Sequence, residues 1–317
     1  MEEVDVVQSV DLEDPEEFLD ALAPRSAHFR DKPQGAWIFR GIDDDTYQFV
    51  PAALRTDERS RERFERLGEA GPVVPGEEPK RQVRAEIVIV AKFAWLADAQ
   101  GLPLPEDTQE LRERIRTERA IDDFAAEFVM GRKQWPPEGM FSLIGLAQHY
   151  RLPTRLLDWT RHAFTAAYFA ARNPARNGTT RSRRLVVWAF NTEILETLRR
   201  RGGDFPFFLA CYIVTAPSAG NPNLAAQQGV FTLWQSPSGE LGPQRAPLDE
   251  ALAAFLKDRK HTPDQPLFKR LTLPACEARR LMRLLQREGI TAARLFPGYQ
   301  GVADAIDERS MYGDLSP

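Results

Sequence analysis

The chain has 317 residues, of which 42 are lysine or arginine, 46 are aspartate or glutamate, and 43% are hydrophobic. This length suits one large domain or two modest ones, and a chain of this size can bury a full hydrophobic core. The formal net charge of −4 argues against a global attraction to nucleic acid or to an anionic membrane.

The sequence carries no pattern typical of export, membrane insertion or metal binding. Its first residues are acidic and lack the basic and apolar stretches of a signal peptide, and its apolar runs are far shorter than a membrane span. Cys211 and Cys276 have no CxxC or Cys–His spacing that would indicate a zinc site. We therefore expect a cytoplasmic protein with no membrane contact and no metal.

The chain begins with an acidic lead-in at residues 1–30, followed by the main domain at 31–310. Within the lead-in, Asp14 and the proline after it mark the start of a short helix. A short apolar run that begins at Trp37 predicts a strand ending at Gly41.

Helices are expected to dominate the rest of the first half. Residues 56–82 are highly charged and broken by adjacent glycine and proline residues, which predicts a mobile insertion on the surface. Helical segments are expected at 84–100, 106–130, 141–150 and 162–172. The first of these also contains β-branched residues that suit a strand, but its length, its alanines and its flanking charges favour a buried helix. The alanines of the last segment permit close packing against a sheet.

The second half reads mainly as strands. Continuous apolar runs predict strands at 185–190, 210–214, 229–234 and 268–273, and helices follow at 275–288 and at the end of 294–306. The predicted order, with one early strand, helices in the first half and strands in the second, indicates the α+β class. We expect a single mixed domain with a central, mostly antiparallel sheet flanked by helices.

Arg40 is the first candidate site residue. It stands at the end of an apolar strand and before a glycine, where its guanidinium presents fixed donors that suit a phosphate or a carboxylate. The alternative is a structural ion pair with an aspartate such as Asp158.

Residues 148–160 hold the second group of candidates. This helix-turn-strand segment gathers amide, imidazole, phenol, guanidinium, carboxylate, indole and hydroxyl groups. His149 is a candidate acid or base, and Asp158 a candidate base or partner of an arginine. Thr160 directly precedes a helix. It is either the N-cap of that helix or a hydroxyl directed at a ligand, and it can be both, since a helix N-terminus also favours anions. A buried, hydrogen-bonded histidine and a core position for Trp159 are the structural alternatives.

A third candidate is Gln228, the second of two glutamines before a glycine at a strand start. Amide side chains form hydrogen bonds with ribose hydroxyls and base edges but perform no acid–base chemistry. The alternative is that the two glutamines form a turn at the strand entrance. The sequence contains no GxGxxG, P-loop, HExxH or GxSxG motif, which disfavours a Rossmann dinucleotide site, a Walker NTPase and a zinc hydrolase.

These segments resemble the FRG-domain family, whose naming motif is present here as Phe39-Arg40-Gly41. The family pattern Gln-His-Tyr-x-Leu-Pro-Thr-Arg-Leu-Leu-Asp-Trp-Thr closely matches residues 148–160. An Ala-x-x-Phe-Ala helix matches 166–170, and a Gln-Gln-Gly-x-Phe strand start matches 227–231. The resemblance runs from about Trp37 to about Ile306 and implies a bacterial protein.

A looser resemblance is to ADP-ribosyltransferase-like folds, which use NAD. It implies that Arg40 holds the pyrophosphate or the nicotinamide ribose and that Thr160 supports the nicotinamide side. Gln228 then takes the place of the glutamate that binds the ribose hydroxyl and activates the acceptor. Because glutamine cannot accept that proton, Asp158 or His149 would supply the base, or the activity differs.

The resemblances imply an ADP-ribosyltransferase or an NAD glycohydrolase, acting as a toxin or in phage defence. The candidate catalytic residues are Arg40, His149, Asp158, Thr160 and Gln228. The candidate residues for binding NAD are Arg40, Gly41, Tyr150, Thr154, Arg155, Trp159 and Thr160. The partner would be a nucleotide-like small molecule, with a protein or a nucleic acid as acceptor. A module that binds a phosphorylated ligand without turnover is the first alternative. Nucleic-acid binding, suggested by arginines at 181–184 and 199–201, is the second.

Overall fold

The computed structural model describes residues 5–30, 36–129, 134–180, 182–201, 211–235, 245–258, 263 and 265–312. Its strands are β1 (Val7–Asp11), β2 (Trp37–Ile42), β3 (Leu156–Thr160), β4 (Arg184–Asn191), β5 (Cys211–Val214), β6 (Gly229–Trp234) and β7 (Phe268–Pro274). They form one seven-stranded sheet in the order β1-β7-β4-β2-β3-β6-β5. All neighbouring strands are antiparallel except β1 and β7, so the predicted α+β class with a mostly antiparallel sheet is confirmed.

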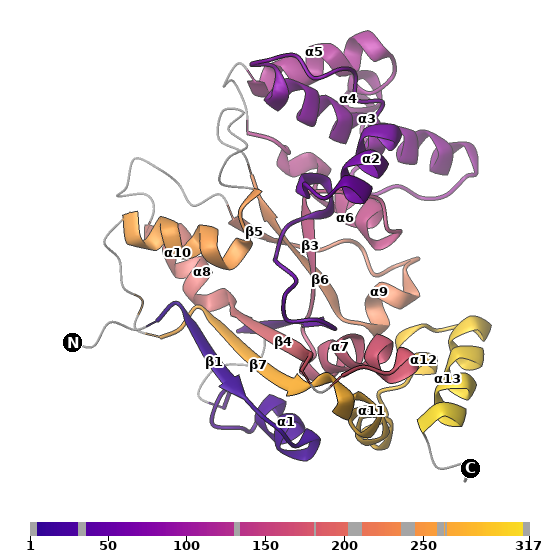
Figure 1. Ribbon diagram of the computed structural model, residues 1–317. Coiled ribbons are helices and arrows are strands. Elements are labelled where there is room, and N and C mark those ends of the chain that lie inside the picture. The colour runs from indigo at the N-terminus through magenta and orange to yellow at the C-terminus, as the bar shows by residue number, and fades with distance from the viewer. Residues whose placement is uncertain are drawn as a thin grey trace.

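Helices surround this sheet (Figure 1). They are α1 (Pro15–Leu22), α2 (Glu58–Leu67), α3 (Glu78–Ala99), α4 (Gln109–Arg114), α5 (Glu118–Val129), α6 (Phe141–His149), α7 (Ala163–Asn177), α8 (Thr192–Arg201), α9 (Pro222–Ala226), α10 (Leu248–Asp258), α11 (Ala278–Arg287), α12 (Ala292–Leu295) and α13 (Tyr299–Tyr312). Helices α2 to α6 gather at one end of the molecule, and α1, α7 and α11 to α13 at the other. No helix in the described ranges is long and apolar enough to cross a bilayer.

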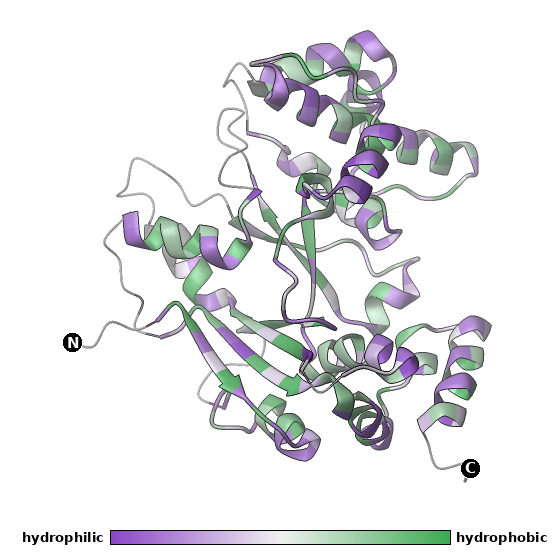
Figure 2. Ribbon diagram, viewed as in Figure 1, coloured by the Kyte–Doolittle hydropathy of each residue, from purple (hydrophilic) through white to green (hydrophobic). Residues whose placement is uncertain are grey.

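Strand β4 is buried on both faces, as its continuous apolar run predicts. Leu185, Val187 and Ala189 pack with α1, α7 and α11, whereas Val186 and Phe190 pack with α8 and α10 on the opposite face. Figure 2 shows the hydrophobic residues concentrated along the central strands, while α2 is largely hydrophilic. A third part of the core lies where α3, α5 and α6 cover β3, β5 and β6.

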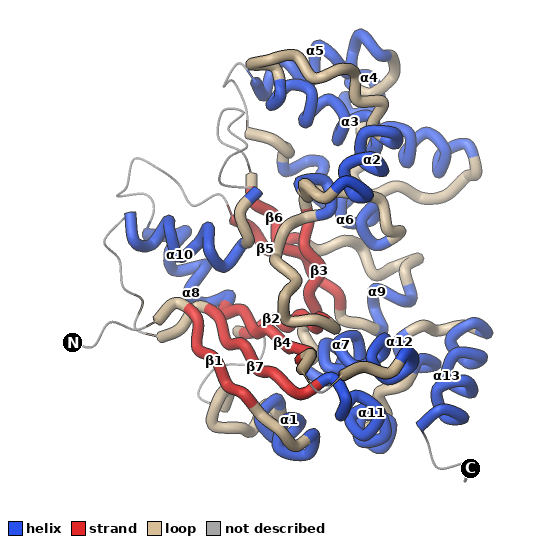
Figure 3. The backbone as a smooth tube through the Cα atoms, viewed as in Figure 1, coloured by secondary structure: helices blue, strands red, loops and turns tan. Residues whose placement is uncertain are grey.

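The sheet consists of two parts that meet between β2 and β3 (Figure 3). Strand β2 pairs with β4 along its whole length, Trp37–Ile42, but pairs with β3 only at Phe39 and Thr160. We call this junction the seam. Because backbone pairing stops after one residue pair, the backbone polar groups of β3 that precede Thr160 and face β2 need other partners, such as side chains.

Gly41 allows α7 to lie directly on β2. A Cβ atom at this position would collide with the main-chain carbonyl oxygen of Ala166. Ala166, Ala167, Ala170 and Ala171 of α7 have no exposed surface, as the small-residue pattern of the helix predicts. The glycine of the Phe-Arg-Gly motif therefore sets the distance between the sheet and α7.

Three segments differ from the sequence-based expectation. The lead-in contributes β1, an edge strand parallel to β7, whose short sequence has no buried side chain and thus no clear apolar pattern. Residues 56–82 contain α2 and the first turn of α3, and Phe64 of α2 is buried. The single helix predicted at 106–130 is replaced by α4 and α5, because Thr117 accepts a hydrogen bond from the N–H of Ala120 and begins a new helix.

We expect Gly41→Ala to destabilise the fold by about 3 kcal/mol or more, because the added methyl group forces α7 away from β2. Gly71→Ala is the matched control, since nothing lies within 4 Å of a Cβ atom at that position. Urea unfolding of both variants measures the difference. Equal stabilities would show that α7 adjusts without cost.

His162 connects the stability of α7 to pH. Its Nδ1 accepts a hydrogen bond from the N–H of Thr165 at 3.3 Å and caps the helix. Burial lowers the pKa of His162 below 6.5, and Arg294 adds to the shift. Burial also lowers the pKa values of His28 and His149. The unfolded chain therefore binds protons at mildly acidic pH that the folded chain does not, and stability falls as pH drops through about 6.5.

His162→Asn should reduce this loss, because asparagine caps helices well and does not titrate. Each histidine of this kind contributes up to about 1.4 kcal/mol per pH unit. Urea unfolding at about pH 7.5 and about pH 5.5 compares the variant with the unaltered chain. An identical loss in both proteins would contradict a role for His162 in the pH response.

Candidate functional site

Arg40 bridges the seam. Its Nη1 donates a hydrogen bond to the main-chain carbonyl of Asp158 at 2.6 Å and lies 3.7 Å from Oδ2 of the same residue. The Nε atom is buried, and no described residue accepts a hydrogen bond from it. Burial lowers the pKa of Arg40, while Asp158 opposes the shift and Arg55 adds to it. The guanidinium thus has donor capacity left beside an acidic side chain.

The carboxylate of Asp158 is held in place but remains open to solvent. Its side chain is 57% exposed, and Oδ2 accepts a hydrogen bond from Nε2 of Gln148 at 2.9 Å. The buried hydroxyl of Thr154 donates to Oε1 of the same glutamine at 2.7 Å, which fixes the orientation of the amide. Burial lowers the pKa of His149, and the charge of Asp158 partly opposes this shift. Arg40 and Asp158 therefore meet at the seam, and His149 at the end of α6 is near enough for the charge of Asp158 to affect its pKa.

Thr160 and Gln228 lie next to this group, at the entrance to α7. The Thr160 hydroxyl donates to the carbonyl of Gln227 at 2.6 Å and accepts from the N–H of His162 at 3.0 Å. Thr160 is two residues from Asp158 on the same face of β3. Gln228 is exposed and has a left-handed backbone (φ 49°), directly before the glycine that pairs with Thr160.

Other candidates from the sequence have partners within the protein. Arg155 is 2% exposed and forms two hydrogen bonds with Glu86 of α3, at 2.6 and 2.7 Å. Trp159 is buried and donates to the hydroxyl of Thr232 at 2.9 Å. The Tyr150 side chain is 57% exposed, and its hydroxyl donates to Asn221 at 3.3 Å.

A model of the FRG domain matches residues 35–179. This chain carries an FRG domain. No curated protein and no solved structure matches the chain. The matched span of the FRG domain runs from β2 to α7, so it contains both sides of the seam and the group formed by Arg40, Gln148, His149 and Asp158.

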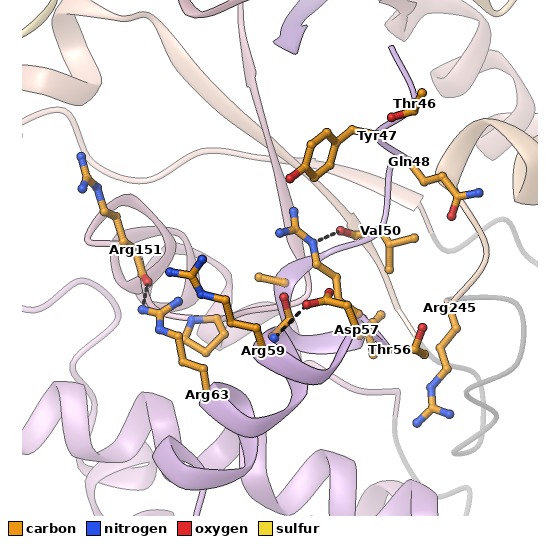
Figure 4. Close-up of a pocket in the computed structure, with 15 residues that line it drawn as sticks. Thr46, Tyr47, Gln48, Val50, Thr56, Asp57, Arg59, Arg63, Arg151 and Arg245 are labelled. Atoms are coloured by element: carbon orange, nitrogen blue, oxygen red, sulfur yellow. Dashed lines mark hydrogen bonds between the residues drawn. The ribbon is translucent and has the colours of Figure 1, made fainter. Parts of the chain in front are cut away.

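Beside this group lies a cavity of about 910 Å³, lined mostly by residues of the matched span and also by Arg245 outside it. Its lining includes five arginines and one carboxylate, which are Arg55, Arg59, Arg63, Arg151, Arg245 and Asp57 (Figure 4). We call it the arginine cavity. It adjoins the seam through the chain itself, because Pro153 of its lining directly precedes Thr154, whose hydroxyl holds Gln148 beside Asp158. Arg55 of the lining is also near enough to Arg40 to lower its pKa.

Sequence reasoning missed the arginine cavity because its lining comes from separate segments at 46–63, 151–153 and 245. One local signal was present. Arg55, Arg59 and Arg63 follow one another at intervals of four residues, and the last two lie on one face of α2.

Arg155→Met tests the structural role of that arginine in the FRG domain. The change leaves Glu86 buried without its cation, so we expect a loss of about 3–5 kcal/mol in unfolding free energy. The double variant Arg155→Met/Glu86→Leu should regain much of this loss, since no charge is then left unpaired. Urea unfolding of the two variants measures both effects. A stable Arg155→Met protein that fails to bind ligand would instead favour a binding role.

Proposed function

We propose that this FRG-domain protein uses NAD as a substrate and breaks the bond between nicotinamide and ribose. The observation that supports this most is that Arg40 and Asp158 meet at the seam, with His149 within the electrostatic reach of Asp158. The acceptor of the ADP-ribosyl group is water in a glycohydrolase, and a protein or nucleic acid in a transferase.

The chemistry of this bond suits the residues at the seam. When the C1′–N bond breaks, its electron pair returns to the pyridine ring, nicotinamide leaves as a neutral molecule, and positive charge develops on the ribose. An exposed carboxylate such as that of Asp158 stabilises this charge if it lies beneath the ribose. His149, neutral because burial lowers its pKa, then accepts the proton of the attacking water or acceptor.

Arg40 and Gln228 have supporting roles in this proposal. Arg40 has a buried Nε without a partner in the described part of the chain, and its guanidinium suits the negatively charged pyrophosphate. Gln228, exposed near Thr160, suits a ribose hydroxyl but accepts no proton. The carboxylate in this proposal therefore comes from Asp158.

The second candidate function is binding of a nucleotide without turnover. It is favoured by the contacts that Asp158 already makes within the protein. Its carboxylate accepts a hydrogen bond from Gln148 and lies 3.7 Å from Arg40. Such contacts also suit an aspartate whose role is to join β3 to α6 and β2.

The direct test is incubation of the purified chain with NAD while free nicotinamide is followed. We expect Asp158→Asn to reduce the release at least about a hundredfold, because the variant loses the stabilising negative charge. Asp122→Asn is the matched control, since Asp122 is also an exposed aspartate in an ion pair with an arginine, but on α5. The rate for the unaltered chain should fall at acidic pH once His149, whose pKa lies below 6.5, becomes protonated.

Two outcomes would contradict the proposal. One is nicotinamide release that is equal in the Asp158→Asn and Asp122→Asn proteins. The other is no release at all, even with cell lysate and nucleic acid supplied as acceptors, from a chain that binds the nucleotide. The latter result would establish the non-catalytic binding module.

A further inference from the structure

We propose that the arginine cavity binds a nucleoside diphosphate, with the two phosphates held by Arg59 and Arg63 and the base stacked on Tyr47. The site is distinct from the residues at the seam, although the two adjoin. This inference requires binding alone, so it holds whether or not the domain turns over NAD.

The charge of the cavity is the first reason. No carboxylate in the described part of the chain forms an ion pair with any of the five arginines. The single acid of the lining, Asp57, caps α2 by accepting a hydrogen bond from the N–H of Ser60 at 3.0 Å. This hydrogen bond lowers the pKa of Asp57 and keeps it charged, with a smaller effect from Arg55. Positive charge in a concave site raises the local concentration of anions.

The positions of the arginines are the second reason. Arg59 and Arg63 stand one helical turn apart on the same face of α2, so their Cβ atoms are separated by about 5–6 Å. Arg63 donates to the carbonyl of Arg151 at 2.6 Å, and Arg55 donates to that of Val50 at 3.1 Å. These bonds orient the guanidinium groups of Arg63 and Arg55 on the cavity wall without neutralising them. Adjacent phosphates of a pyrophosphate fit such a pair of guanidinium groups.

Tyr47 indicates that the ligand carries a base in addition to phosphates. It belongs to the cavity lining, is 60% exposed, and has no ring partner among the described residues. Figure 4 shows its ring across the cavity from Arg59 and Arg63. A free aromatic face in a polar cavity suits stacking of a nucleotide base, and the amide of the neighbouring Gln48 suits its hydrogen-bonding edge.

The dimensions and net charge favour a small nucleotide over a nucleic acid strand. A volume of about 910 Å³ lies at the upper end of the range of about 300–1,000 Å³ for small-molecule sites. The chain as a whole has a formal charge of −4, which repels a long polyanion outside the cavity.

The test measures binding of ADP and of inorganic pyrophosphate to the full chain by calorimetry. We expect Arg59→Gln/Arg63→Gln to weaken both ligands at least about a hundredfold, since two charge-assisted contacts are lost. Arg61→Gln/Arg66→Gln is the matched control, because it removes the same charge from α2 at residues outside the cavity lining. This control should change affinity by no more than about threefold.

Tyr47→Ala separates the base from the phosphates. It should weaken ADP about tenfold through loss of stacking and leave pyrophosphate binding unchanged. Circular dichroism and urea unfolding confirm that each variant is folded.

Three results would overturn the proposal. They are equal affinities in the two double variants, no binding of either ligand by the unaltered chain, and tighter binding of a single-stranded oligonucleotide than of ADP with the same arginine dependence. Nicotinamide release without Arg59- and Arg63-dependent ADP binding would contradict this site alone. ADP binding without nicotinamide release would contradict the NAD reaction and leave this site supported.

Discussion

The seam between β2 and β3 is the constraint on which the rest of the structure depends. Backbone pairing there is limited to Phe39 and Thr160, so a side chain joins the two parts of the sheet beyond this point. Arg40 provides that link through the carbonyl of Asp158, which leaves the carboxylate of Asp158 exposed. Arg40 therefore joins the two parts of the sheet and also belongs to the candidate site, so a substitution of Arg40 affects both.

The three residues of the Phe-Arg-Gly motif perform three different physical tasks. Phe39 packs in the core beneath α7, with its ring 5.3 Å from that of Phe29. Arg40 crosses the seam, and Gly41 leaves room for the backbone of α7. Two of the three positions thus serve the architecture, and only the arginine also offers donors to a ligand.

Strong local patterns made much of the fold and part of the site predictable. The apolar run of β4, the alanines of α7 and the dense polar segment at 148–160 each indicated the structure that the chain adopts. Edge strand β1 was missed because burial, which creates the pattern, is weak at an edge. The partner of Arg155 was equally hidden, since Glu86 is 69 residues away and composition does not reveal which arginine of a segment points inward.

The arginines near the seam differ in how fully the protein compensates their positive charge, and this difference makes the charge uneven across the site. Arg155 is paired with a full carboxylate in the core, whereas Arg40 has a carbonyl at hydrogen-bond distance and a carboxylate slightly farther away. Arg55 and Arg63 have carbonyl partners only. Because a carbonyl orients a guanidinium but carries no net charge, uncompensated positive charge increases from the core toward the arginine cavity. The proposed nucleotide site therefore lies where positive charge is least compensated, and the exposed carboxylate of Asp158 lies outside the lining of the cavity.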